Sequence, residues 1–391
     1  MMASIDTFLP TLGAAHARLA AVDINAYAKT RNAIDGAVSR LSPYVTHGFL
    51  SFPQIASAVQ DQAGFGPQHK FVFELGWRAY FHHVWQHLGD GIFESLHEGI
   101  LPENAYQRGL PLDIHAGNTG IPVIDCAVQE LVQTGYLHNH ARMWLASYLV
   151  HIRKVHWLVG AQWMYGHLLD GDLASNMLSW QWVAGTGSTK PYLFNADNVA
   201  KYAPKAWHSQ GTVLDASYEQ MHDIAKTASS HITHESSSDL KNSAAYFSIP
   251  TSHTLSALVK DRAIYLVHPW SLGELPPALP ADALILGVAD SRFHAAHPWS
   301  AGRWDWVMTR MRQITPHCYA PSFDDLQAAL ALAASVHYAP NPHAAWLSDL
   351  THPALHATAL PKLFTDVDIY GGSFAKWWKK TELRNFHSTE Q

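Results

Sequence analysis

The chain has few cysteines and little charge for its length. Cys126 and Cys318 are the only two among 391 residues, too few for a disulfide scaffold or a cysteine-based zinc site, and we expect no metal. Charged residues make up 15% of the chain, and 32 acidic against 26 basic side chains give a net charge of −6. This balance excludes a uniformly basic nucleic-acid coat, but it is compatible with a local basic groove.

Signals for secretion and for membrane insertion are also missing. Asp6 stands where a secretory leader carries basic residues, and no adequate apolar stretch follows it. The most apolar helical candidate, 143–150, is followed by His151, Arg153 and Lys154, so it is well short of the ~18 residues that a membrane span needs. We therefore expect a soluble, cytoplasmic protein with no membrane partner.

Apolar and aromatic residues are abundant. Hydrophobic residues make up 48% of the chain and aromatic residues 12%, including 15 tryptophans. A large core can therefore form, which excludes disorder as the main state. The length predicts two or three domains. So many tryptophans indicate either a large core or a ligand site.

The first half of the chain has a helical pattern. Residues 69–88 are apolar all round and predict a deeply buried helix. Residues 122–134 begin with proline and are followed by glycine, as helices often are, and a longer helix is predicted over 138–158. We expect no strands here and assign 1–220 to a helical domain. A serine- and histidine-rich linker is expected over 221–260.

The period changes after residue 261. Ala263–Val267 and Ala283–Val288 are short, nearly all-apolar runs typical of buried parallel strands. They alternate with predicted helices at 302–313 and 323–334 and with weaker strand candidates at 317–320 and 335–338. This alternation predicts a smaller C-terminal α/β domain over 261–391. It contains neither GxGxxG nor GxxxxGK[ST].

Two segments combine ionisable, amide and aromatic residues at helical spacing. In DGDLASNMLSWQWVAGTG, Asp170 and Asp172 precede a helix on which Asn176 and Trp180 share a face. In HNHARM, Asn139, Arg142 and Met143 share a face, and Arg142 is a plausible partner for Asp170. Helix caps, a structural ion pair and core tryptophans would explain these residues equally well.

Two further segments carry polar groups. Glu74, Trp77 and Arg78 share a face of an otherwise apolar helix, which indicates a site or a structural ion pair. Ser39 and Ser42 stand near a helix start, where hydroxyls act as caps or bind phosphate.

Taken together and in this order, these segments resemble the FAD-binding domain of the photolyase/cryptochrome family, from about Tyr27 to Asn195. The motifs are SRLSPY, ELxWR, TGxPxxD, HNxxRM and DGDLASNxxxWQWxAGTG. The resemblance is closest to cyclobutane pyrimidine dimer photolyases and implies a mainly α-helical fold that binds FAD. The cofactor-binding residues it implies are Tyr27, Ser39, Arg40, Leu41, Ser42, Arg78, Asn139, Arg142, Asp170, Asp172 and Asn176.

The resemblance also implies a reaction, light-driven repair of pyrimidine dimers in DNA by electron transfer from reduced FAD. Asn176 would face the flavin N5, and an asparagine there favours an anionic reduced flavin because it does not readily donate a proton. Trp180 and Trp157 would deliver electrons to the flavin. The third tryptophan of the family's chain is missing. Asn104 stands at its place, and Tyr106 is the nearest aromatic residue.

A pocket for an extruded dimer is implied by Glu74, Trp77, Asn139, Met143 and Trp182, with the two tryptophans offering stacking faces. Two basic residues of the family are missing. His140 replaces one, and the segment before Phe194 lacks an arginine, so we expect weak DNA binding. A cryptochrome-like blue-light photoreceptor without repair, acting through a signalling partner, is the alternative. Oligomeric state is left open.

The order of the domains departs from the family. Photolyases carry an α/β antenna domain before the FAD domain, whereas only 26 residues precede Tyr27 and the α/β segment follows. Leu284–Phe293 and the helix with Arg303 and Trp304 weakly resemble a strand and a helix of that antenna domain. A permuted antenna-like domain and an unrelated α/β domain are both open.

Overall fold

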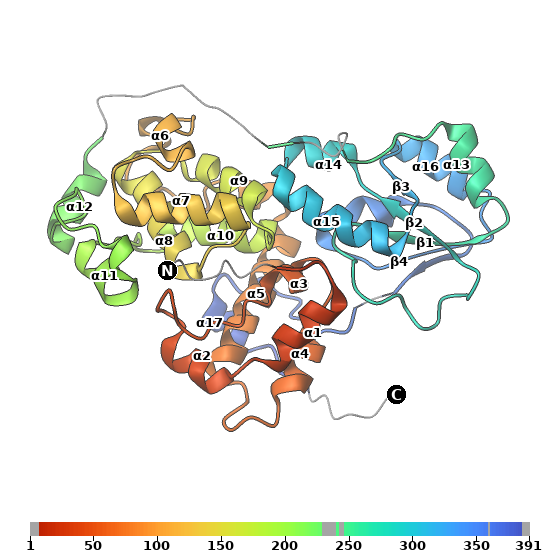
Figure 1. Ribbon diagram of the computed structural model, residues 1–391, viewed down its shortest axis with the longest axis horizontal. Coiled ribbons are helices and arrows are strands. Elements are labelled where there is room, and N and C mark those ends of the chain that lie inside the picture. The colour runs from red at the N-terminus through yellow and green to blue at the C-terminus, as the bar shows by residue number, and fades with distance from the viewer. Residues whose placement is uncertain (1–7, 229–239, 242–245, 359, 385–391) are drawn as a thin grey trace.

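The computed structural model describes residues 8–228, 240–241, 246–358 and 360–384 (Figure 1). Residues 8–228 are helical, as expected, and the described residues here contain one isolated bridge, Gln107 to Val155, but no strand ladder. The helices and helical turns are α1 (Leu12–Ala20), α2 (Ile24–Thr30), α3 (Ser42–Thr46), α4 (Phe52–Val59), α5 (Lys70–Leu88), η1 (Gly89–Phe93), η2 (Glu103–Ala105), α6 (Leu112–His115), α7 (Pro122–Thr134), α8 (Asn139–Ser147), η3 (Tyr148–Ile152), α9 (Trp157–His167), α10 (Leu173–Ala184), α11 (Ala196–Tyr202), η4 (Lys205–Trp207) and α12 (Tyr218–Lys226).

Two of these helices, α5 and α10, carry three predicted site residues each. His69 begins α5 by accepting the N–H of Phe71. Asp172 begins α10 by accepting the N–H of Ser175, and Gly185 ends it in the left-handed conformation with a φ of 79°. Neither helix has a wide polar face, and α10 contacts α5, α8 and α9.

The single helix predicted over 138–158 is wrong. The structure has α8, a π-helical turn over Tyr148–Ile152, a break, and then α9 from Trp157. Lys154 lies in the break with a φ of 53°, and its buried ammonium group donates to the carbonyls of His151, Ile224 and Ala225. The break lets Lys154 satisfy carbonyls at the end of α12, a distant contact that local periodicity does not reveal.

The predicted α/β domain is present. Its described strands form a five-stranded parallel sheet in the order β3-β2-β1-β4-β5. Sequence analysis misses β5, because its three residues are not an apolar run and two of them are exposed. The elements are α13 (Ser252–Val259), β1 (Ala263–Val267), β2 (Leu284–Val288), α14 (Ser291–Ala296), α15 (Ala301–Ile314), β3 (Cys318–Tyr319), α16 (Phe323–Leu330), β4 (Ser335–Tyr338), η6 (Pro342–Asp349), β5 (Leu355–Ala357) and α17 (Phe374–Trp378).

The stretch expected as a linker is partly helical. α12 crosses the expected boundary at 220, beginning with a capping box between Ser217 and Gln220. α13 occupies the end of the stretch. Residues 229–239 and 242–245 of the serine-rich segment lie outside the described residues.

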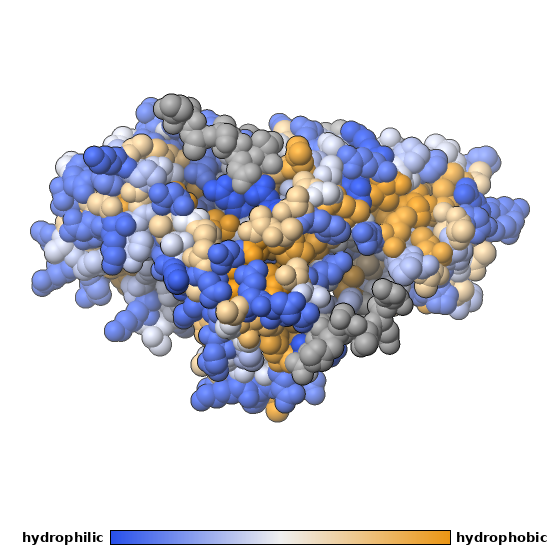
Figure 2. Space-filling model, turned by 60° about the horizontal axis from the view of Figure 1, so that its bottom comes forward, coloured by the Kyte–Doolittle hydropathy of each residue, from blue (hydrophilic) through white to orange (hydrophobic). Residues whose placement is uncertain are grey.

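The two domains share a core. α15 contacts α9, and Trp306 of α15 packs against the rings of Tyr44 and Phe49 (Figure 1). α17 returns to the helical domain and contacts α5. The space-filling view shows hydrophobic residues in the middle of one face and over the α/β domain at its right (Figure 2). Among the described residues, no helix has the length and apolar character to cross a bilayer.

The sheet also fixes which loops reach the helical domain. Strand order reverses between β1 and β4, and the carboxyl ends of strands at such a point are where open α/β sheets usually bind ligands. Trp270 follows β1 and His343 follows β4, and both are buried. Their rings stack on each other with centroids 5.0 Å apart.

Candidate functional site

Two aspartates in the loop between α9 and α10 form the centre of the predicted site. Nη2 of Arg142 lies 3.0 and 2.8 Å from the two carboxylate oxygens of Asp170, so the ion pair expected from sequence is present. Only 4% of the Asp170 side chain is exposed. Burial would raise the pKa of Asp170, but Arg142, helped by Ser42, holds it below its ordinary value.

Asp172 has a second set of partners. Its Oδ2 accepts from Nη2 of Arg78 at 3.1 Å and lies 2.8 Å from Nε2 of His82. Arg78 also donates to the hydroxyl of Thr46, which in turn donates to the main-chain oxygen of Asp170. Burial would raise the pKa of Asp172, but Arg78 and His82 hold it well below its ordinary range. Asp172 is therefore a carboxylate at neutral pH.

Tyr27 and Glu74 lie at one end of this polar network. Nε of Arg31 lies 3.5 Å from Oε1 of Glu74, whose side chain is 41% exposed. Burial raises the pKa of Glu74 despite that arginine. Burial, together with the Glu74 carboxylate, raises the pKa of the Tyr27 hydroxyl, so Tyr27 stays a neutral donor.

Tyr136 connects this end to the aspartates. The guanidinium groups of Arg40 and Arg142 lie 5.8 and 5.6 Å from the centre of its ring. Leu41, which follows Arg40, is buried, and Ser39 and Ser42 are half-buried. Arg40 and Arg142 thus meet at Tyr136, and Ser42 meets Asp170.

The unused donors of this region fit a dinucleotide cofactor. Among the described residues, Nη1 of Arg142 and both Nε and Nη1 of Arg78 have no hydrogen-bond acceptor. The Arg142 side chain is 24% exposed and the Arg78 side chain 20% exposed. Partly exposed guanidinium N–H groups beside serine hydroxyls are the donors that phosphate oxygens take. The residues present therefore fit FAD at its phosphate side.

The predicted electron path is buried and incomplete. Asn176 donates from Nδ2 to Ala161 O at 2.8 Å, which fixes its amide, and Trp180 is 2% exposed beside Gly160. Trp157 is also buried and donates to Ser95. Among the described residues, no tryptophan ring packs against the ring of Trp157. Instead the ring of His156 lies 5.8 Å from Trp157 and 6.3 Å from Tyr106, which is half-buried.

Two of the residues predicted to bind a dimer are exposed. Trp182 is 42% exposed, and Asn139 is exposed. Nδ2 of Asn139 lies 3.7 Å from Sδ of the half-buried Met143. His140, in contrast, points inward. Its Nδ1 bonds Asn32 O at 2.8 Å and its ring stacks on Trp144, so it serves packing.

Trp77 has an unexpected neighbour. The ring of Phe374, from α17, stacks on it with centroids 4.1 Å apart and planes 10° apart. One face of Trp77 is therefore covered by the chain's own C-terminal segment. Trp378 of the same helix packs over Gly76, where a β-carbon would lie 2.2 Å from its ring.

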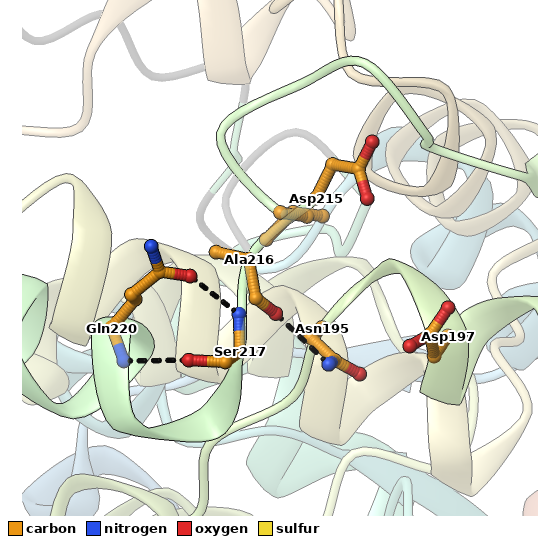
Figure 3. Close-up of a pocket in the computed structure, with 7 residues that line it drawn as sticks. Asn195, Asp197, Asp215, Ala216, Ser217 and Gln220 are labelled. Atoms are coloured by element: carbon orange, nitrogen blue, oxygen red, sulfur yellow. Dashed lines mark hydrogen bonds between the residues drawn. The ribbon is translucent and has the colours of Figure 1, made fainter.

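Two cavities of the described structure lie away from the predicted FAD-binding residues. One of about 310 Å³ is lined by Asn195, Asp197, Leu214, Asp215, Ala216, Ser217 and Gln220 (Figure 3). The other, about 270 Å³, is lined by Pro67, Phe364, Trp378, Thr381, Glu382 and Leu383. Neither includes a predicted FAD-binding residue. Figure 3 shows Gln220 and Ser217 forming the capping box of α12, and Asn195 donating to Ala216 O.

Sequence analysis missed several residues of the polar network. His82 is four residues after Arg78 on α5, a spacing that could have identified it. Thr46 is the last residue of α3 and Arg31 follows the end of α2, and no local pattern connects them to Arg78 or Glu74. His343 comes from the other domain and lies 3.8 Å from Oδ2 of Asp172.

Part of the chain is similar to known proteins. Residues 71–241 match the family described as the FAD binding domain of DNA photolyase. A deoxyribodipyrimidine photo-lyase of Streptomyces griseus is 37% identical over 159 residues, 40% of this chain and 34% of that protein. A cryptochrome DASH of Synechocystis sp. is 31% identical over 197 residues, 48% of this chain and 40% of that protein.

A cryptochrome and a photolyase are also among the solved structures similar to part of this chain. A cryptochrome of Synechocystis sp. PCC6803 is 30% identical, with a TM-score of 0.45 over 51% of this chain and 44% of that one. A class III photolyase from Agrobacterium tumefaciens is 23% identical, with a TM-score of 0.44 over 55% of this chain and 50% of that one. The match to the curated relatives spans about 34–40% of their own length.

Proposed function

Residues 71–241 belong to the FAD-binding domain family of DNA photolyase, and from this premise we propose that the protein repairs cyclobutane pyrimidine dimers in DNA under light. The observation that carries the proposal is the position of the dimer-pocket residues. The Glu74 side chain is 41% exposed and Trp182 is 42% exposed, whereas Asp170 and Asp172 are buried. Their exposure leaves Glu74 and Trp182 available to a ligand from solvent.

The chain would hold the cofactor through its polar network. The free guanidinium N–H groups of Arg78 and the hydroxyls of Ser39 and Ser42 suit the phosphates. Arg142 and Asp170 would orient the remaining polar groups of the cofactor, and Asn176 would face the flavin. When bound and reduced, FAD would supply the electron that splits the dimer. The task of the protein is to bind, orient and exclude water.

The pocket residues would bind an extruded dinucleotide. The exposed ring of Trp182 offers a stacking face for a base. Burial raises the pKa of Glu74, which favours the protonated carboxyl group, the form able to donate to a pyrimidine carbonyl. With a net charge of −6 and an inward-facing His140, we expect weak binding that favours single-stranded or distorted DNA.

A blue-light photoreceptor without repair is the second candidate, and the Trp77–Phe374 stack favours it. If a base must stack on the face that Phe374 covers, the pocket is closed in this conformation. The relatives carry both photolyase and cryptochrome names. A photoreceptor would need the FAD site but no open dimer pocket.

A repair assay separates the two candidates. FAD-loaded, reduced protein is mixed with an oligonucleotide carrying one thymine dimer, as a single strand and as a duplex, under blue light and in the dark. We expect repair in light, faster on the single strand, and none in the dark. A protein that retains FAD but repairs neither substrate would exclude the enzyme and leave the photoreceptor.

A further inference from the structure

The loop Leu168–Leu173, here called the aspartate loop, carries Asp170 and Asp172 and joins α9 to α10. Arg303, from α15 of the other domain, is 1% exposed and reaches the main chain of this region. Its Nη1 donates to Tyr165 O and its Nη2 to Gly171 O, both at 2.7 Å. One guanidinium group therefore joins the last turn of α9 to the aspartate loop.

Arg303 is fully buried without an ion pair. No carboxylate of the described residues lies within ion-pair distance, and its charge lies 3.9 Å from the centre of the Trp299 ring. Burial lowers the pKa of Arg303 to about 10, so it remains charged at neutral pH. A buried cation without a carboxylate is costly, so its two main-chain bonds must be well made.

Gly171 makes this approach possible. A β-carbon on Gly171 would lie 2.3 Å from Nη1 of Arg303 and 2.7 Å from Tyr165 O. A side chain at this position would displace the guanidinium group. Because Gly171 has no side chain, the guanidinium group of Arg303 can lie directly against the main chain of the aspartate loop.

His343 makes the second contact from the α/β domain. It is 2% exposed, and its Nε2 accepts the N–H of Leu173 at 3.1 Å. Its Nδ1 lies 3.0 Å from Oδ1 of Asn341, which fixes the neutral tautomer with the proton on Nδ1. The first N–H of α10 is one that no turn of its own helix can satisfy, and here the other domain satisfies it.

His47 adds a third connection. Its two ring nitrogens lie 2.8 Å from Leu169 O in the aspartate loop and 2.5 Å from Pro269 O after β1. A neutral His47 ring has one N–H and can donate to only one of these two oxygens, so the bonds that hold the aspartate loop are those at Gly171 and Leu173, on both sides of Asp172. The sheet edge where such folds usually bind a ligand contacts this loop through His343.

We propose that the α/β domain is part of the FAD site, with Arg303 and His343 as positioning residues that fix Asp170 and Asp172 through the main chain of the aspartate loop. This proposal rests on the FAD site of the proposed function. Neither residue touches the substrate. Both act by keeping the two carboxylates where Arg142 and Arg78 meet them.

The test compares Arg303→Met with Arg310→Met in the full chain. Arg310 is a matched control, because it lies on the same helix and also donates to two main-chain oxygens, those of Leu272 and Gly273, away from the aspartate loop. Hydrogen exchange of a peptide covering 168–176 is measured in the FAD-free protein, and the Kd for FAD is measured by titration. Arg303→Met should speed exchange and raise Kd about tenfold to a hundredfold, the scale of a lost charged hydrogen bond. Arg310→Met should change neither.

His343 offers a rescue experiment. His343→Leu removes the acceptor of Leu173 N–H and should raise the FAD Kd about tenfold. His343→Gln can place an amide oxygen near the position of Nε2 and should restore much of the affinity. A role in general stability alone would give the two variants similar losses. If Arg303→Met does not fold, Arg303→Lys, which keeps the charge but not both bonds, replaces it with the same expected direction.

The outcomes separate this inference from the proposed function. Folded Arg303 and His343 variants with wild-type exchange and wild-type FAD affinity overturn the inference and leave the function intact. If the variants lose FAD affinity as expected but the wild-type protein repairs no dimer, the inference is supported and the proposed function is excluded. A wild-type protein that binds no FAD contradicts both.

Discussion

Arg142 binds both carboxylate oxygens of Asp170 through one nitrogen, Nη2, while its Nε donates to Leu137 O at 2.7 Å. This leaves Nη1 without an acceptor among the described residues. The side chain thus joins α8 to the aspartate loop and still has a donor for a ligand. Its role is both structural and ligand-directed, and the two can be separated by experiment.

Arg142→Ala should release or strongly weaken FAD. It leaves Asp170 buried without its partner, which should cost about 3 kcal/mol of unfolding free energy, the lower end for a buried pair because Arg142 is 24% exposed. Arg153→Ala is the control, since Arg153 forms a comparable pair with the more exposed Asp113. It should cost about 1 kcal/mol or less and leave FAD bound. Normal FAD retention in Arg142→Ala would refute the assignment.

Electron supply should depend on Trp180 and Trp157. Phenylalanine at either position should strongly slow photoreduction of the bound flavin, followed by absorbance, while FAD stays bound. Tyr106→Phe should lower the yield if the path continues through His156 to Tyr106. Trp144→Phe is the control, a buried tryptophan that bonds Asn198. An unchanged rate in Trp180→Phe would show that this path is not used.

Docking of α17 on α5 should be sensitive to Gly76. In Gly76→Ala the new methyl group meets Trp378 at 2.2 Å, and we expect a loss of about 1–3 kcal/mol in unfolding free energy by overpacking. Gly13→Ala in α1 meets nothing within 4 Å and should instead gain about 0.5–1 kcal/mol from helix propensity. Urea unfolding measures both. Equal effects in the two variants would mean that Trp378 does not pack there.

Acid should destabilise the FAD-free protein through buried neutral histidines such as His268. Burial lowers the pKa of His268 to about 4, and its ring bonds suit the neutral form, with Nε2 facing Ala339 O and Nδ1 accepting from Trp270. The unfolded chain, with a histidine pKa of about 6.5, binds more protons as pH falls from about 6.5 to 4, so the stability present above pH 6.5 is lost across that window.

His268→Gln should make this pH dependence shallower by about 1.4 kcal/mol per pH unit, the contribution of one proton. The measurement is the unfolding free energy between pH 6.5 and 4. His253→Gln, at an exposed position, serves as the control. The same slope in His268→Gln and wild type would contradict a buried neutral His268.

Local sequence patterns predict much of the fold. The apolar runs of β1 and β2 and the glycine after α7 gave elements close to those in the structure, because each depends on neighbours in sequence. The helix break at Lys154 and the short strand β5 depend on distant carbonyls and on pairing with β4, which no local pattern encodes. The antenna-like assignment of the α/β domain stays a prediction.

In the site, too, the features set by sequence neighbours could be predicted and those set by distant contacts could not. Helical spacing placed Arg142 and Asn139 on one face and made Asp170 a plausible partner for Arg142, and the ion pair is present. Arg303 and His343 lie 132 and 170 residues from their partners Gly171 and Leu173, so their contacts with the aspartate loop arise only when the two domains pack together. The Phe374 ring on Trp77 was equally inaccessible to sequence.

The central claim is electron transfer from reduced FAD, held by the polar network, to a pyrimidine dimer. Its most direct test is the excited-state lifetime of the reduced flavin in the FAD-loaded protein, measured with saturating single-stranded oligonucleotide that carries one thymine dimer. The same oligonucleotide without the dimer is the reference. We predict a shorter lifetime with the dimer, together with recovery of thymine absorbance on illumination. Identical lifetimes with the two oligonucleotides, both shown to be bound, would contradict the claim.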